Sequence, residues 1–117
     1  MTSITEIVPG YAVAPQIVPE DVAEIAALGY RSIMCNRPDG EDPGQPGVAE
    51  VRAEAERLGL AFAFVPVVSG AIQPENVNDF VDALGDLPGP VLAYCRSGTR
   101  CQNLWLLAQH GRTAPAR

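Results

Sequence analysis

The residues best suited to covalent chemistry form one short run, Cys95-Arg96-Ser97-Gly98-Thr99-Arg100. The apolar segment Val91–Tyr94 precedes this run and an amphipathic segment follows it, which predicts a strand, a loop and the start of a helix. Ligands of open α/β sheets bind beyond the carboxyl ends of the strands. The amides of a first helical turn also stabilise an anion. We therefore predict that Cys95 is a nucleophile whose thiol pKa lies below that of a free thiol.

The rest of the run predicts an anion-binding site around that sulfur. The guanidinium of Arg100 offers a planar fork that matches two oxygens of a sulfate-like or phosphate-like group. Arg96 adds positive charge, and the hydroxyls of Ser97 and Thr99 are further hydrogen-bond donors. Gly98 has no side chain to block the approach of a ligand. We predict Cys95 and Arg100 as catalytic residues and the four residues between them as substrate-binding residues.

The other titratable candidates are weaker. A cysteine at a strand end is commonly only a small apolar residue, and the neighbours of Cys35 predict that role for it. Cys101 is expected to be buried, although its position also allows it to meet Cys95 as a redox partner. His110 lies near the far end of the last helix, too far from Cys95 to act as its base.

Alternating strand-like and helix-like segments predict an α/β fold, with a parallel sheet flanked by helices. In the first predicted helix, Leu28 belongs to the apolar stripe, and in the last one Leu104, Leu107 and Ala108 are expected to face the core. The predicted strands are Tyr11–Ala14, Arg31–Asn36, Leu60–Val68 and Val91–Tyr94, and the predicted helices begin at Pro19, Val48, Pro74 and Thr99.

A long loop rich in proline and glycine, residues 37–47, follows the second predicted strand. Long loops at strand ends often carry functional residues, so Arg37 and Asp39 are candidate accessory residues. The carboxyl groups of Asp39, Glu41 and Asp42 could supply a general acid. Their setting in a polar loop instead favours solvated charges.

Composition limits the function further. The 117 residues suit a single domain over 1–117, and eight arginines, no lysine and 14 acidic residues give a net charge of −6, which disfavours general nucleic-acid binding. We expect neither a secretion signal nor a membrane-spanning segment, and three cysteines without scaffold spacing fit the cytoplasm. No ligand spacing indicates a metal, and no cofactor is expected.

Two families share these motifs. The Cys-x4-Arg loop resembles the active loop of single-domain rhodaneses, which are sulfurtransferases. The order of the elements resembles the phosphatase-like domain of the beta-lactamase hydrolase-like family, whose relatives are also described as sulfurtransferases and can be fused to a persulfide dioxygenase. The matching segments are Cys35–Glu41, Val65–Gly70 and Pro88–Arg100. This resemblance implies a fold like that of the dual-specificity phosphatases, with Cys95 as nucleophile and Arg100 as oxyanion-binding arginine.

The sequence departs from the phosphatase pattern in two ways. Phosphatases of that fold use Cys-x5-Arg, whereas here the arginine comes one position earlier. The loop Ser69–Gln73 contains no carboxylate where such enzymes place their general acid. We therefore predict a sulfurtransferase acting on a small sulfane-sulfur anion, with a persulfide dioxygenase as candidate partner. A phosphatase with the same nucleophile and a non-catalytic anion-binding module are the alternatives.

Overall fold

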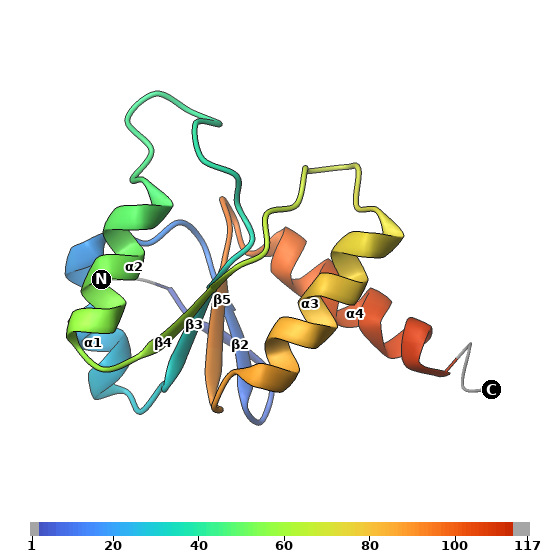
Figure 1. The fold of residues 1–117 in the computed structure, drawn as a ribbon, viewed down its shortest axis with the longest axis horizontal. Coiled ribbons are helices and arrows are strands. Elements are labelled where there is room, and N and C mark those ends of the chain that lie inside the picture. The colour runs from blue at the N-terminus through green and yellow to red at the C-terminus, as the bar shows by residue number, and fades with distance from the viewer. Residues whose placement is uncertain (1–2, 114–117) are drawn as a thin grey trace.

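A five-stranded sheet forms the centre of the protein in a computed structural model that describes residues 3–113 (Figure 1). The strands lie in the order β1-β2-β5-β3-β4. Their bounds are Thr5–Val8 for β1, Tyr11–Ala14 for β2, Ser32–Cys35 for β3, Ala61–Phe64 for β4 and Val91–Tyr94 for β5. A 3-10 turn at Pro19–Asp21 leads into α1, Val22–Ala27, and the other helices are α2, Val48–Arg57, α3, Pro74–Asp86, and α4, Thr99–Thr113.

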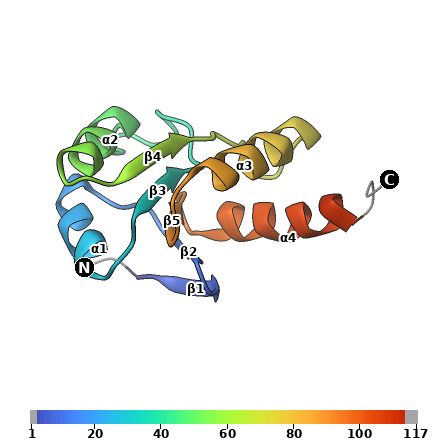
Figure 2. The ribbon, with the colours of Figure 1, turned by 60° about the horizontal axis from the view of Figure 1, so that its bottom comes forward.

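The α/β fold with a helix-flanked sheet is confirmed, but the sheet is not wholly parallel. Strands β2, β5, β3 and β4 are parallel, while β1 pairs with β2 in the antiparallel direction at the edge opposite β4 (Figure 2). The two-residue connection Pro9-Gly10 explains this, since a connection so short joins only antiparallel strands. Gly10 adopts a φ of 94°, which the turn requires. Strand β1 was not among the strands predicted from the sequence.

Helices cover both faces of the sheet (Figure 1). In β2, Ala12 and Ala14 belong to the core beneath α1 and α2, while Tyr11 and Val13 belong to the core beneath α3 and α4. This alternation is the two-residue period of a strand buried on both faces. The central strands are therefore held between two helical layers.

Tyr11 anchors the second layer. Its ring stacks on Trp105 with centroids 5.0 Å apart and meets Phe80 edge-on at 5.8 Å. Its hydroxyl donates a hydrogen bond to the carbonyl oxygen of Cys101 at 2.8 Å. The first turn of α4, which follows the Cys95 loop, is thereby tied to the central sheet.

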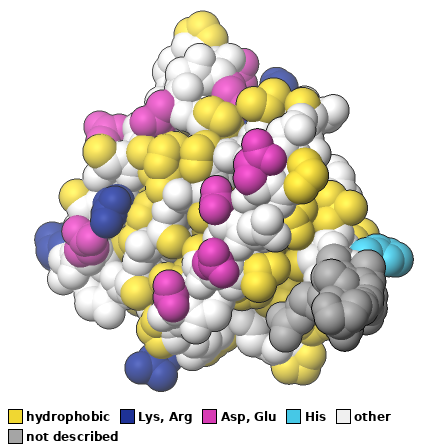
Figure 3. Space-filling model, turned by 45° about the vertical axis from the view of Figure 1, so that its right-hand side comes forward, with side chains coloured by type: hydrophobic (Ala, Val, Ile, Leu, Met, Phe, Trp, Pro, Cys, Tyr) yellow, Lys and Arg dark blue, Asp and Glu magenta, His cyan; other side chains and the backbone are white. Residues whose placement is uncertain are grey.

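The prediction that Leu28 and Leu107 face the core is wrong. Leu28 is 60% exposed and Leu107 is 42% exposed, whereas Leu104 and Ala108 are buried as expected. Leu28 is the C-cap residue after α1, and Leu107 lies on α4. The face that carries α3 and α4 shows hydrophobic side chains interspersed with acidic ones (Figure 3). Within residues 3–113, no helix combines the length and the apolar character that a membrane span requires.

Candidate active site

The Cys95 loop connects the carboxyl end of β5 to α4. Gly98 adopts a φ of 94°, a left-handed conformation that side chains disfavour, and its amide donates to Cys95 Sγ at 3.1 Å. A Cβ at this position would lie 3.5 Å from the carbonyl oxygen of Ala14 in the neighbouring strand. The glycine thus lets the loop curl over the sulfur.

Cys95 is fully buried, and its pKa is lowered to about 5. The largest cause is a hydrogen bond from the Cys101 side chain, against which burial acts in the opposite direction. The backbone amides of Cys101, Gly98 and Ser97 lower the pKa further. The amides act as the loop pattern predicts, whereas the contribution of Cys101 was not foreseen. Cys95 is therefore a thiolate at neutral pH.

Arg100 folds back over the loop, and its side chain is only 7% exposed. Nη1 donates to Glu41 Oε2 at 2.7 Å and to the carbonyl oxygen of Val67 at 2.9 Å, and Nη2 donates to Glu41 Oε1 at 2.9 Å. Ion-paired Glu41 raises the pKa of Arg100 further above its usual value. The arginine is thus fixed by groups from the segments that follow β3 and β4.

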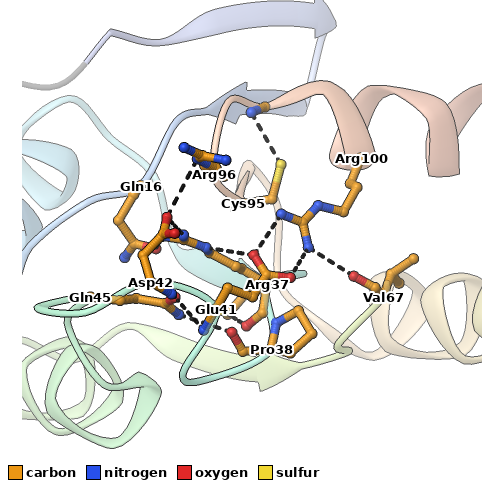
Figure 4. A network of polar contacts seen from close by, with 12 residues as sticks. Gln16, Arg37, Pro38, Glu41, Asp42, Gln45, Val67, Cys95, Arg96 and Arg100 are labelled. Carbon is orange, nitrogen blue, oxygen red and sulfur yellow. Dashed lines mark hydrogen bonds and ion pairs between the residues drawn. The ribbon is translucent and has the colours of Figure 1, made fainter. Parts of the chain in front are cut away.

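Glu41 is a partner of two arginines and not a solvated loop charge, which corrects the sequence expectation. Its Oε1 also accepts from Arg37 Nε at 2.8 Å. The hydrogen bonds from Arg100 and then Arg37 lower the pKa of Glu41 to about 2, although its partial burial opposes this. Arg37 is 3% exposed and binds Gln16 Oε1 at 3.0 Å and Asp42 Oδ2 at 2.6 Å as well (Figure 4).

No local sequence pattern announces this network, because its members are far apart in the chain. Glu41 and Arg100 are separated by 59 positions, and Gln16 and Arg37 by 21. Arg37 and Glu41 are only four positions apart, but this spacing predicts an ion pair in a helix and the loop is not helical. Sequence reasoning placed Arg37 near the site but missed what it binds.

The remaining predicted binding residues lie around the mouth of the site. Arg96 is exposed, with Nε 3.5 Å from Asp42 Oδ2. The hydroxyl of Ser97 donates to that of Thr99 at 3.0 Å, so these two groups are bonded to each other. Asp39 is directed elsewhere, because its Oδ1 accepts the amide of Val48 at the first residue of α2 at 2.9 Å.

We expect this contact to give Asp39 a structural role. Asp39→Ala is expected to lower the free energy of unfolding by about 1 kcal/mol, the usual cost of losing a side-chain cap. The rate of Cys95 alkylation should not change. Urea unfolding and iodoacetamide labelling measure the two quantities, with Asp82→Ala on the exposed side of α3 as control. A slower Cys95 reaction in Asp39→Ala alone would show an accessory chemical role instead.

The other cysteines lie in the core. Cys35 is 2% exposed, donates to the carbonyl oxygen of Arg37 at 3.2 Å, and has its pKa raised by burial. Cys101 is fully buried, and its burial raises the pKa of its thiol well above the usual value. His110 is exposed near the end of α4. Among residues 3–113, no cluster of His, Cys, Asp and Glu could hold a metal ion.

An open cleft of about 830 Å³ lies over the loop. Its walls come from the carboxyl ends of three strands and from the start of α4, and they include Glu41, Asp42, Ser69, Arg96, Thr99 and Arg100. Charged and hydroxyl groups therefore face this cleft, while the buried Cys95 precedes the lining residues Arg96 and Ser97 in the chain. The geometry suits a small anion held over a thiolate.

The chain resembles known proteins over most of its length. It is 41% identical over 98 residues to the beta-lactamase hydrolase-like protein of Xylella fastidiosa, a match that covers 84% of this chain and 23% of that protein. The chain thus spans about a quarter of the length of this curated relative. It is also similar to a solved Neisseria meningitidis protein described as a candidate phosphatase, with 37% identity, a TM-score of 0.85, and 96% and 80% of the two chains covered.

A more distant structure shares the fold alone. The core catalytic domain of a PP-IP phosphatase from Saccharomyces cerevisiae matches with a TM-score of 0.63 at 16% identity, over 81% of this chain and 57% of that one. The fold is that of the dual-specificity and tyrosine phosphatases. The family model described as the phosphatase-like domain of beta-lactamase hydrolase-like protein matches residues 3–112. The chain therefore belongs to the family of beta-lactamase hydrolase-like phosphatase-like domains.

Proposed function

We propose that the protein is a sulfurtransferase that carries sulfane sulfur as a persulfide on Cys95. The thiolate attacks the outer sulfur of thiosulfate, a new S–S bond forms, and sulfite leaves with the electron pair of the broken S–S bond. Cyanide or a thiolate then takes the outer sulfur and releases Cys95 as a thiolate. No proton has to be supplied to either leaving group.

The main support for this proposal is that each carboxylate of the loop 37–47 is already bound by other groups of the protein. Phosphate ester hydrolysis needs an acid that protonates the leaving oxygen. Glu41 is held ionised by two arginines, with a pKa of about 2. Asp42 binds Arg37, and Asp39 binds the amide of Val48. A thiolate with a pKa of about 5 beside these groups favours a reaction that requires a nucleophile and no acid.

The burial of Cys95 supports a small substrate. Because its sulfur has no exposed surface, the reacting atom of the substrate has to be carried on a slender group past Arg100. A terminal sulfane sulfur meets this requirement. Arg96 and Arg100 supply the positive charge that attracts its anion.

Phosphatase activity is the second candidate, and one observation favours it. The Neisseria meningitidis structure, at 37% identity, is described as that of a candidate phosphatase. An anion site over a thiolate also binds a phosphate group. The same Cys95 would then form a phosphocysteine, and the ester oxygen would leave without a proton from the loop carboxylates. Activated aryl phosphates are expected to react slowly, and phosphotyrosine peptides more slowly still.

The covalent adduct on Cys95 distinguishes the candidates. Incubation with thiosulfate is expected to add one sulfur atom to the peptide that contains Cys95, detected by mass spectrometry, and cyanide should remove it as thiocyanate. Cys95→Ser should abolish both steps, while Cys35→Ser, which alters a buried thiol outside the loop, serves as the control. Both persulfide and thiocyanate are measured against the same protein without donor.

Other adducts would favour the alternatives. Efficient hydrolysis of a phosphotyrosine peptide, blocked by orthovanadate and without any sulfur gain on Cys95, would establish the phosphatase. Protection of Cys95 from alkylation by sulfate, with neither adduct formed, would indicate an anion-binding module. The single domain over 1–117, the cytoplasmic location and the persulfide dioxygenase partner stay predictions.

A further inference from the structure

Hydrogen bonds divide the Arg100 guanidinium into an occupied and an unoccupied edge. An arginine side chain has five N–H donors. Both Nη1 donors are used, one by Glu41 and one by the carbonyl oxygen of Val67, and one Nη2 donor is used by Glu41. Within the part of the chain that the structure describes, the Nε donor and the second Nη2 donor have no acceptor. These two N–H groups lie parallel on one edge of the guanidinium, which is the arrangement that binds two oxygens of one anion.

The occupied edge is held by a support that is itself fixed. Glu41 Oε1 accepts from Arg37 as well as from Arg100. The other donors of the buried Arg37 bind Gln16, beyond the end of β2, and Asp42 in the same loop as Glu41. Figure 4 shows the Arg100 guanidinium between the Glu41 carboxylate and the Cys95 sulfur. Without the Glu41 carboxylate, Arg100 would keep only its hydrogen bond to the carbonyl oxygen of Val67 among these contacts, and one bond does not fix the plane of the guanidinium.

We propose that Glu41, supported by Arg37, is the positioning residue that holds Arg100 with its Nε–Nη2 edge toward the anion over Cys95. The inference rests on the proposed function only in that Arg100 binds the anion, and it applies equally to a sulfur-bearing and a phosphorus-bearing anion. Glu41 does not touch the reacting atoms. The negative charge of its carboxylate also neutralises the positive charge of one arginine. We therefore expect anion binding to depend more on the orientation of Arg100 than on the total positive charge of the site.

Glu41→Gln tests this role with little change in shape. The amide places an N–H group against the Arg100 donors, so one side of the bidentate pair is lost. The control is Glu56→Gln, which removes the same charge from an exposed pair with Arg52, 3.3 Å apart on α2. The readout is the sulfate concentration that halves the rate of Cys95 alkylation. We expect it to rise about tenfold in Glu41→Gln, the effect of losing one charge-assisted hydrogen bond, and to stay unchanged in Glu56→Gln.

A second readout separates positioning from a merely structural role. Each half-protecting sulfate concentration is taken relative to the alkylation rate of the same variant without sulfate, so a general change in the reactivity of Cys95 does not count as a change in anion binding. The side chain of Glu41 is 26% exposed, so the glutamine variant should fold, as its circular dichroism spectrum will show. If it does not, Glu41→Asp replaces it, since this variant keeps the charge and withdraws the carboxylate by one methylene.

Three outcomes decide the inference. A half-protecting sulfate concentration equal to that of the wild type in the folded variant would overturn it. Stronger protection would overturn it too, because Glu41 would then be a competitor of the anion. Weaker protection in the folded variant, measured against its own rate without sulfate, supports it. This holds even if thiosulfate adds no sulfur to the wild-type Cys95, which would refute the sulfurtransferase but not the positioning role.

Discussion

Arg100→Lys is expected to lower the rate of persulfide formation on Cys95 about a hundredfold, the scale seen when one preorganised donor to a transition state is removed. Lysine keeps the positive charge, but its ammonium cannot bind Glu41, the carbonyl oxygen of Val67 and two substrate oxygens in fixed directions. The present guanidinium makes three hydrogen bonds to the first two of these groups. The substitution therefore removes orientation while it keeps charge.

The rate is measured by incubating the protein with thiosulfate, quenching the reaction at timed intervals, and determining the sulfur content of the Cys95 peptide by mass spectrometry. Arg52→Lys is the matched control, because Arg52 is exposed on α2 and pairs with Glu56. It should react like the wild type. Equal rates in the two variants would mean that Arg100 contributes only charge, and the fork geometry would then have no part in the chemistry.

The loop around Cys95 could be predicted from the sequence because its determinants are local. Four apolar residues, a glycine and a helical pattern follow one another in the chain, and β5 and the start of α4 lie where they indicate. The amides that lower the pKa of Cys95 belong to the same few residues. Adjacent residues thus define both the conformation of this loop and much of its electrostatics.

The setting of Arg100 could not be predicted in this way. Its partner Glu41 lies in a loop without regular structure, and the pair forms only once β3 and β5 are neighbours in the sheet. A carboxylate in a polar loop looks the same in sequence whether it is solvated or held by two arginines. The side chain of Arg37, 4% exposed, is the structural sign that the loop is held in place.

The edge strand β1 and the exposed leucines illustrate the same limit. Thr5–Val8 carries two exposed residues followed by two half-buried ones, so no clean alternation marks it as a strand. Leu28 and Leu107 have apolar side chains at plausible helical spacing, yet the surface they reach is not covered by the sheet. Helical period indicates which side chains share a face, but not how far the covering layer extends.

Cys101→Ala is expected to slow the alkylation of Cys95 about tenfold at about pH 4, below the pKa of the thiol in both proteins, which corresponds to a rise of one unit in that pKa. The hydrogen bond from the Cys101 side chain is the largest of the causes that lower the pKa of Cys95 to about 5. Its removal leaves the backbone amides of Gly98 and Ser97 in place, so the pKa should rise without reaching its usual value. The pH at which alkylation becomes half-maximal should rise accordingly.

Cys101→Ser is the matched variant, because a hydroxyl donates to the thiolate as a thiol does. It is expected to keep the half-maximal pH near that of the wild type.

The lowered pKa of Cys95 also affects the free energy of unfolding. Since the folded state lowers the pKa of Cys95, its ionisation stabilises that state above the ordinary thiol pKa, and the contribution is lost as the pH falls toward 5. Cys101→Ala should therefore flatten the rise of unfolding free energy with pH between these limits. If alanine and serine variants show the same alkylation profile as the wild type, the amides of the loop alone hold the thiolate, and the buried Cys101 contributes only to packing.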